Sequence, residues 1–416
     1  MKKLFLVNCF LILSFFLHAQ VTLEECQRKA KENYPLIRQQ ELIQKSETYL
    51  LSNLSKNYLP QISVGAKASY QSAVTELPVQ IPGIQVKGQS KDQYQMQLEV
   101  NQTIWDGGVT SNKKALQRAS REVDEQQLEV DLYPLEERVD NLFFGVLLLE
   151  EELRQNETLR RQLELNKQQV QACMNGGIAN AADLDEVEVT ILSALQQKDE
   201  CTYSLKAYRS MLSLFTGEDL SKVTFQKPAP VSVSGEIDRP ELSLLEARIG
   251  YLEEQKRGVN RELNPRLGAF VQGGYGRPGL NMLKREFEGY YIAGLRVSWN
   301  LSPFYTRKNT LHVLENSQQE LRLNREAFLL NTRMDLSRQQ EESDKQKKLM
   351  QHDDEIIRLR GNIRKASEVK LQNGTLNATD LMRDVLSEHQ AYLQKFLHEI
   401  QWLKSLYQQK TLTNNP

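Results

Sequence analysis

The second half of this chain repeats the first, and this repeat constrains the fold more than any single motif. Residues 177–184 read GIANAADL and residues 374–381 read GTLNATDL, so glycine, asparagine, aspartate and leucine recur 197 positions later. A repeat of about half the chain indicates two copies of one large supersecondary unit. Each copy reads as helix, strand, loop, strand, very long helix, turn and long helix.

The repeat predicts the division of the chain. We expect a signal peptide (1–19), a first repeat (20–214), a linker (215–240), a second repeat (241–412) and a short tail (413–416). The strands are expected at 60–73 and 92–106 in the first copy and at 265–277 and 289–302 in the second. The long helical hairpins are expected at 107–214 and 304–412.

The N-terminus is typical of an exported protein. Lys2 and Lys3 precede an apolar run from Leu4 to Leu17, and a small residue, Ala19, follows. This pattern predicts a signal peptide. No later apolar run approaches the ~18 residues that a spanning helix needs. The exported chain is therefore either soluble in the periplasm or a β-barrel in an outer membrane.

Cysteine and charge usage exclude several classes. Cys26, Cys173 and Cys201 form an odd, sparse set, which does not indicate a disulfide framework, although Cys173 and Cys201 flank the first repeated turn and could meet across a hairpin. The formal charge is −1 and the two signs are interspersed, so we expect no nucleic-acid partner. We find no catalytic constellation, and we expect no enzyme activity, cofactor or bound metal.

The four predicted strands alternate apolar and polar residues with period two. This alternation indicates strands with one apolar and one polar face. Their length of about 10–13 residues suits tilted membrane strands. We expect the lipid-facing residues to be Tyr94, Met96, Leu98, Val100, Leu295 and Val297. Trp105 and Trp299 end two strands and suit the aromatic girdle of a membrane barrel. Strands of a soluble sandwich remain an alternative on this pattern alone.

The helical segments are unusually long. Only Pro134 interrupts residues 107–175, and no proline occurs in 304–373. About 70 helical residues span about 100 Å, and apolar residues at 3–4 spacing, such as Ile356, Leu359 and Ile363, indicate a coiled-coil stripe. Since four strands cannot close a membrane barrel and an open edge in lipid is costly, two, three or four chains must associate.

These features together resemble the TolC-like outer-membrane efflux protein family, over essentially the whole mature chain. The residues that carry the resemblance are Thr22–Cys26, Asn33–Pro35, Tyr58–Ile62, Asn101–Gly108 and the duplicated turn. The resemblance implies a mainly α fold with a membrane β-barrel contribution: a homotrimer with a twelve-stranded barrel in the outer-membrane lipid of a Gram-negative bacterium and a periplasmic α-barrel. It also implies docking to a periplasmic adaptor (membrane fusion) protein and an inner-membrane exporter of the RND or ABC type.

The resemblance also suggests site residues. Family members close the tube at the helix tips with aspartates, and Asp183 and Asp380 match by position, with Asp384 a weaker candidate. The simpler interpretation is that these are favourable charges at helix N-termini. We expect the tip residues Gly177, Gly374, Asn180 and Asn377 to shape the adaptor-docking surface. The predicted function is a passive duct of a tripartite efflux or type I secretion system, and the alternative is a periplasmic coiled-coil adaptor outside the membrane.

Overall fold

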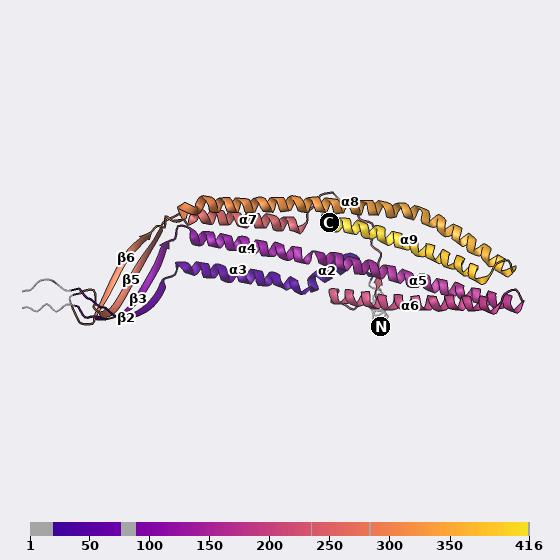
Figure 1. Cartoon of the computed structure of the whole chain (residues 1–416), viewed down its shortest axis with the longest axis horizontal. Helices are drawn as coiled ribbons and strands as arrows, with labels where there is room; N and C mark the ends of the chain where they lie inside the picture. Colours follow the sequence, from indigo (N-terminus) through magenta and orange to yellow (C-terminus); the bar gives the residue numbers. More distant parts are fainter. Residues whose placement is uncertain (1–19, 76–88, 234, 283, 415–416) are drawn as a thin grey trace, which may run out of the picture. The chain divides into compact units, whose positions relative to one another are not determined.

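The chain is mainly helical and carries one four-stranded sheet, as the fold class predicts. The computed structural model describes residues 20–75, 89–233, 235–282 and 284–414 (Figure 1). Contacts within the chain divide it into two compact units. The sheet unit comprises residues 40–127 and 243–325, and the hairpin unit comprises the remaining described residues. Both units therefore combine segments from the two halves of the sequence.

The sheet unit contains four antiparallel strands, which Figure 1 shows side by side. They are β2 (Gln61–Tyr70), β3 (Asp92–Trp105), β5 (Arg266–Arg277) and β6 (Glu288–Ser298). Their order is β2-β3-β5-β6, so the strand that ends the first pair lies beside the strand that begins the second. β2 and β6 form the two edges, and neither edge has a partner strand among the described residues.

The sheet has one apolar and one polar face. Residues paired across an antiparallel sheet share a face, and Leu98 pairs with Val64 and Gly273. Counting every second residue along each strand from Leu98 and its partners gives the apolar face. It includes Ile62, Tyr94, Met96, Val100, Tyr275, Leu295 and Val297. The opposite face carries Lys67, Gln95, Gln97, Glu99, Gln272 and Arg296. Phe270, an exception to the alternation, lies on the polar face beneath the Arg296 guanidinium, 4.8 Å from the ring centroid.

The first strand pair ends in a tight junction built by Asp106, Gly107 and Gly108. The Asp106 carboxylate accepts hydrogen bonds from the backbone N–H groups of Gly108 (3.0 Å) and Thr110 (2.7 Å). Gly107 and Gly108 have φ angles of 74° and 85°, and a Cβ at Gly107 would lie 2.7 Å from the Asn264 Cβ. The Trp-Asp-Gly-Gly sequence therefore turns the chain from strand into helix where a larger residue would not fit.

Long helices lead into and out of the strands. These are α3 (Gln39–Ser55), α4 (Val109–Leu132), α7 (Pro240–Arg261) and α8 (Pro303–Gln372). α8 runs unbroken for 70 residues. The corresponding stretch of the first repeat is interrupted at Tyr133, because Pro134 has no N–H to donate and starts a new helix, α5 (Pro134–Asn175). No described helix combines the length and apolar character that crossing a membrane requires.

The hairpin unit pairs α5 with α6 (Ala181–Thr216), and α8 leads through the second turn into α9 (Ala378–Thr413). Two apolar clusters hold it together. One packs Phe143 and Phe144 of α5 against Leu212 and Tyr407. The other lies next to the turns and contains Leu159, Leu163, Val187, Leu381 and Met382. The apolar side chains of α5 thus serve both clusters along its length.

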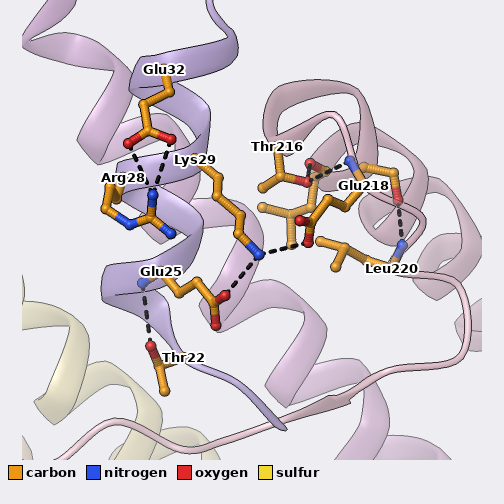
Figure 2. A network of polar contacts seen from close by, with 10 residues as sticks. Thr22, Glu25, Arg28, Lys29, Glu32, Thr216, Glu218 and Leu220 are labelled. Carbon is orange, nitrogen blue, oxygen red and sulfur yellow. Dashed lines mark hydrogen bonds and ion pairs between the residues drawn. The ribbon is translucent and has the colours of Figure 1, made fainter. Parts of the chain in front are cut away.

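The N-terminal helix α2 (Leu23–Asn33) docks onto the end of α6 within the hairpin unit (Figure 2). Thr22 caps it by accepting from the Glu25 N–H at 3.2 Å. Lys29 pairs with Glu25 and with Glu218, each at 2.7 Å. Beside it, the short strands β1 (Gln20–Val21) and β4 (Thr224–Phe225) pair in parallel.

The disulfide that the sequence left open between Cys173 and Cys201 does not form, and the described cysteines are buried free thiols. The antiparallel register of α5 and α6 explains why. The Cys201 Sγ lies 3.3 Å from the Glu152 carboxylate. Glu152 precedes Cys173 by 21 residues, or about 30 Å along a helix. Cys173 and Cys201 flank the same turn, but their thiols lie far apart along the helix pair.

Candidate functional site

The turn between α5 and α6 is a self-capped tip. Asn180 caps α6 by accepting from the Asp183 N–H at 3.1 Å, and the Asp183 carboxylate accepts from the Asn180 N–H at 3.0 Å. Gly177 has a φ of 75°, which favours glycine. The tip residues predicted from the sequence therefore close a reciprocal capping box.

The turn between α8 and α9 has the same construction with one difference. Asn377 accepts from the Asp380 N–H at 2.8 Å, and Gly374 has a φ of 66°. The Asp380 carboxylate pairs with Arg383 at 3.0 Å rather than closing a capping box. The duplicated sequence thus gives two turns with equivalent caps, but the two aspartates have different partners.

The two tips contact each other through Asp183. Its second carboxylate oxygen accepts from the Ala378 N–H, at the start of α9, at 3.2 Å. A Cβ at Gly374 would lie 3.1 Å from the Ile178 side chain, so the turns approach closely. Asp183 therefore caps a helix in each hairpin, a role that the repeat alone does not reveal because Asp380 lacks it.

Asp384, the third candidate, faces the neighbouring helix. Its carboxylate accepts from the Ser367 hydroxyl at 2.6 Å, which links α9 to α8. Next to it, Arg364 of α8 pairs with Glu368 at 2.6 Å and with Glu388 of α9. The polar contact between α8 and α9 was not predicted, although charged residues at helical spacing were visible in the sequence.

The same network reaches α5 and borders a cavity. The Gln162 amide donates to Glu368 at 3.0 Å. The cavity has a volume of about 480 Å³, and Arg154, Arg364, His389 and Tyr392 line it. Burial lowers the pKa of His389. A neutral histidine and carboxylate-paired arginine leave this cavity without strong charge.

The predicted lipid-facing residues lie together on the apolar face of the sheet. In the single chain their exposed fractions run from 45 % at Tyr94 to 73 % at Leu295, while Val100 is half-buried. Trp105 pairs with Leu267 on this face, and the Trp299 indole donates to the Leu263 carbonyl at 2.8 Å. Large apolar side chains exposed side by side indicate a face that another apolar medium or molecule covers.

The described residues bring no three His, Cys, Asp or Glu side chains together as a metal site. The hydrogen-bonding groups of the tips are engaged with one another and with helix ends. At the tips, the Asp183 carboxylate and the Asn180 and Asn377 side chains hold the starts of helices.

Comparison with known proteins agrees with this geometry. Residues 27–218 match the family described as outer membrane efflux protein. No curated protein sequence matches the chain. The outer-membrane channel OprN has a similar structure, with a TM-score of 0.70 at 11% identity over 95% of this chain and 90% of that one. CusC gives 0.68 at 14% identity over 95% and 92%.

The open-state MtrE outer membrane channel of Neisseria gonorrhoeae gives a TM-score of 0.66 at 15% identity, covering 94% of this chain and 88% of that one. At such identities these likenesses show the fold. Together the observations confirm the resemblance drawn from the sequence: residues 27–218 match the outer membrane efflux protein family, and the chain has the fold of TolC-like channels over nearly its whole length.

Proposed function

We propose that three copies of this chain form a passive duct through the outer membrane of a Gram-negative bacterium. The observation that carries the proposal is a four-stranded sheet with one apolar face and with two edges that have no partner strand in the described part of the chain. Its strands alternate in direction, so β6 of one chain can pair antiparallel with β2 of the next. Three chains give twelve strands, and closure satisfies the edge groups that lipid cannot.

The helices support the same assembly. α8 exposes apolar side chains that its own hairpin does not cover, namely Leu349, Ile356, Leu359, Ile363 and Val369. α6 exposes Val189, Leu192, Tyr203 and Leu214. Faces of this kind are suited to a neighbouring copy, whose helices would continue the wall of a periplasmic tube.

The duct would work as the outer-membrane channel of a tripartite efflux or type I secretion system. A periplasmic adaptor would dock on the tips at Gly177, Asn180, Gly374 and Asn377, and an inner-membrane RND or ABC-type exporter would supply the energy. The alternative function, a periplasmic coiled-coil adaptor outside the membrane, has less support. Such an adaptor would not need two helical hairpins and a four-stranded sheet with an apolar face.

We expect the purified full-length protein to be a trimer in detergent. The physical reason is that, among the described residues of one chain, neither edge of the sheet has a partner strand. Light scattering coupled to size exclusion, corrected for bound detergent, measures the protein mass. A monodisperse monomer would contradict the proposal, and dimers or tetramers would replace the trimer with an eight- or sixteen-stranded barrel.

We further propose that Asp183 and Asp380 ring the periplasmic constriction, with Asp384 behind them. Two carboxylates from each chain around a narrow aqueous opening favour cations. Replacing both Asp183 and Asp380 by Ala should weaken cation selectivity and block by divalent or trivalent metal ions in planar-bilayer recordings, with trimer assembly intact.

A second variant separates charge from the structural role of Asp183. Asp183→Asn with Asp380→Asn removes both charges and leaves one oxygen at position 183, which can accept from the Ala378 N–H while the contact with the Asn180 N–H is lost. It should lose selectivity like the Ala variant while keeping the contact between the tips. If both double variants conduct and are blocked as wild type is, the aspartates are only helix-capping residues and the constriction lies elsewhere.

A further inference from the structure

A cavity at the base of the sheet's polar face gathers three cations. Its volume is about 310 Å³, and Lys113 of α4, Arg266 of β5 and Arg296 of β6 line it together with Asp106. All of these residues belong to the sheet unit. The three cations come from separate elements, so only the fold brings them to one site.

None of the three cations has an acidic partner within the described residues. Arg266 pairs across the sheet with Ser298, and Gly268 pairs with Arg296, so the two arginines are diagonal neighbours on one face. Diagonal neighbours in a sheet lie about 7–8 Å apart, within reach of long side chains, and like charges at that separation repel. The arrangement has a cost that a bound anion would offset.

The one carboxylate in the cavity is already engaged. Asp106 accepts from the Tyr58 hydroxyl at 2.8 Å and from the two N–H groups of the strand-to-helix junction. Burial acts to raise its pKa, but these hydrogen bonds outweigh burial and hold the pKa below its usual value. Asp106 therefore remains a single fixed negative charge against three positive ones.

The site is also open and partly preorganised. Gly268 lies between the two arginine positions, and a Cβ there would approach the Gln102 carbonyl oxygen to 3.2 Å. The Arg296 guanidinium lies over the Phe270 ring, 4.8 Å from its centroid. Stacking of this kind holds the planar fork of an arginine while its N–H groups stay available to two oxygens of an anion.

We propose that this cavity binds a small organic dianion, such as a dicarboxylate or a phosphate monoester, between Arg266, Arg296 and Lys113. Both ligand types present two negative charges on oxygen, which arginine binds through paired charge-assisted hydrogen bonds. The cavity volume is at the lower end of the range for small-molecule sites. A cationic molecule would meet three positive charges and one carboxylate that is already hydrogen-bonded.

The consequence for transport rests on the proposed function. In a closed barrel the polar face would line the duct, and each chain would contribute one such site at the inner end of the barrel. Anionic substrates that pass the acidic tips would then meet a basic zone. The sites would favour export of small organic anions over cations of equal size.

Isothermal titration calorimetry of the full-length protein in detergent, at low salt, tests the site with inorganic phosphate and succinate. We expect both to bind, and affinity to fall when sodium chloride rises from about 20 mM to about 200 mM. Neutral succinamide should not bind. Arg266→Gln with Arg296→Gln should weaken binding at least about tenfold, because it removes both paired donors.

The matched control is Arg322→Gln with Arg325→Gln, which removes two exposed arginines from α8 and changes the net charge equally. It should bind like wild type. Absence of binding in wild type, or equal binding in both double variants, would overturn the proposal. If the wild-type protein is a monomer and still binds phosphate and succinate, the proposed duct is contradicted and the proposed anion site is not. If it is a conducting trimer that binds neither, only the anion site is contradicted.

Discussion

Leu98→Arg should destabilise the assembled protein by about 2–4 kcal/mol if position 98 lies near the bilayer midplane, whereas Gln97→Arg should be mild. Leu98 is 47 % exposed on the apolar face, between Val64 and Gly273 on the neighbouring strands. An arginine there would have to leave its charge in lipid or distort the barrel to reach water. Urea titration of protein folded into phospholipid vesicles measures the difference.

Gln97 is the matched control because it is the adjacent residue on the same strand. It pairs with Gly65 and Gly274 on the polar face. The space over Gly65 is open for a longer residue, while the Tyr290 ring covers Gly274. Equal tolerance at 97 and 98 would show that the sheet does not present this face to lipid. A large cost at 97 alone would mean that the two faces are assigned the wrong way round.

Asp140→Asn should stabilise the hairpin unit above neutral pH. Asp140 on α5 is 5% exposed, and its carboxylate accepts from the Gln27 amide of α2 at 2.5 Å. Burial is the main reason that its pKa rises from 3.8 to about 7, and Glu136 and Glu137 nearby add to the shift, while Gln27 and Lys410 oppose it. The folded state therefore favours the protonated acid.

The sign of the pH dependence follows from this shift. Because the folded pKa is above the unfolded one, the folded state binds more protons between about pH 4 and pH 7, and the free energy of unfolding falls as pH rises through that window. Above it, the charged carboxylate costs up to about 4 kcal/mol. Asn cannot ionise, and its amide oxygen can still accept from Gln27.

Thermal unfolding followed by circular dichroism at about pH 4 and about pH 8 checks this expectation. The Asn variant should match wild type at the lower pH and unfold at a higher temperature at the upper one. Asp344→Asn, which changes an exposed carboxylate on α8, is the control and should behave like wild type at both. Equal unfolding temperatures for Asp140→Asn and wild type at the higher pH would show that Asp140 does not carry the cost.

The sequence was sufficient for features that depend on near neighbours. Alternation from Tyr94 to Val100 predicted a strand with one apolar face, because successive side chains of a strand point to opposite sides. Asn180 and Asn377 each begin a helix through a contact that local sequence suffices to make, since a cap involves a residue and the N–H groups just after it. The association of several chains rests on counting strands against the smallest membrane barrel, and it stays a prediction.

Pairings between distant segments were decided only by the tertiary structure. The order that puts β3 beside β5, the free thiols of Cys173 and Cys201, and the bond from Ala378 to Asp183 all depend on how helices and strands align over their full length. A repeat makes Asp183 and Asp380 equivalent in sequence, yet only one of them bridges the hairpins.

The same distinction applies to the proposed anion site. Lys113, Arg266 and Arg296 are unremarkable charges along the chain, and no spacing connects them. They share a cavity because β5 and β6 pair in one register and the Asp106 junction directs α4 away from the sheet at that point. Local sequence determined which residues share the apolar face of the sheet and which share the polar face, because that depends on backbone periodicity. The tertiary structure decided which charges meet, because their meeting depends on strand register and helix packing across the whole chain.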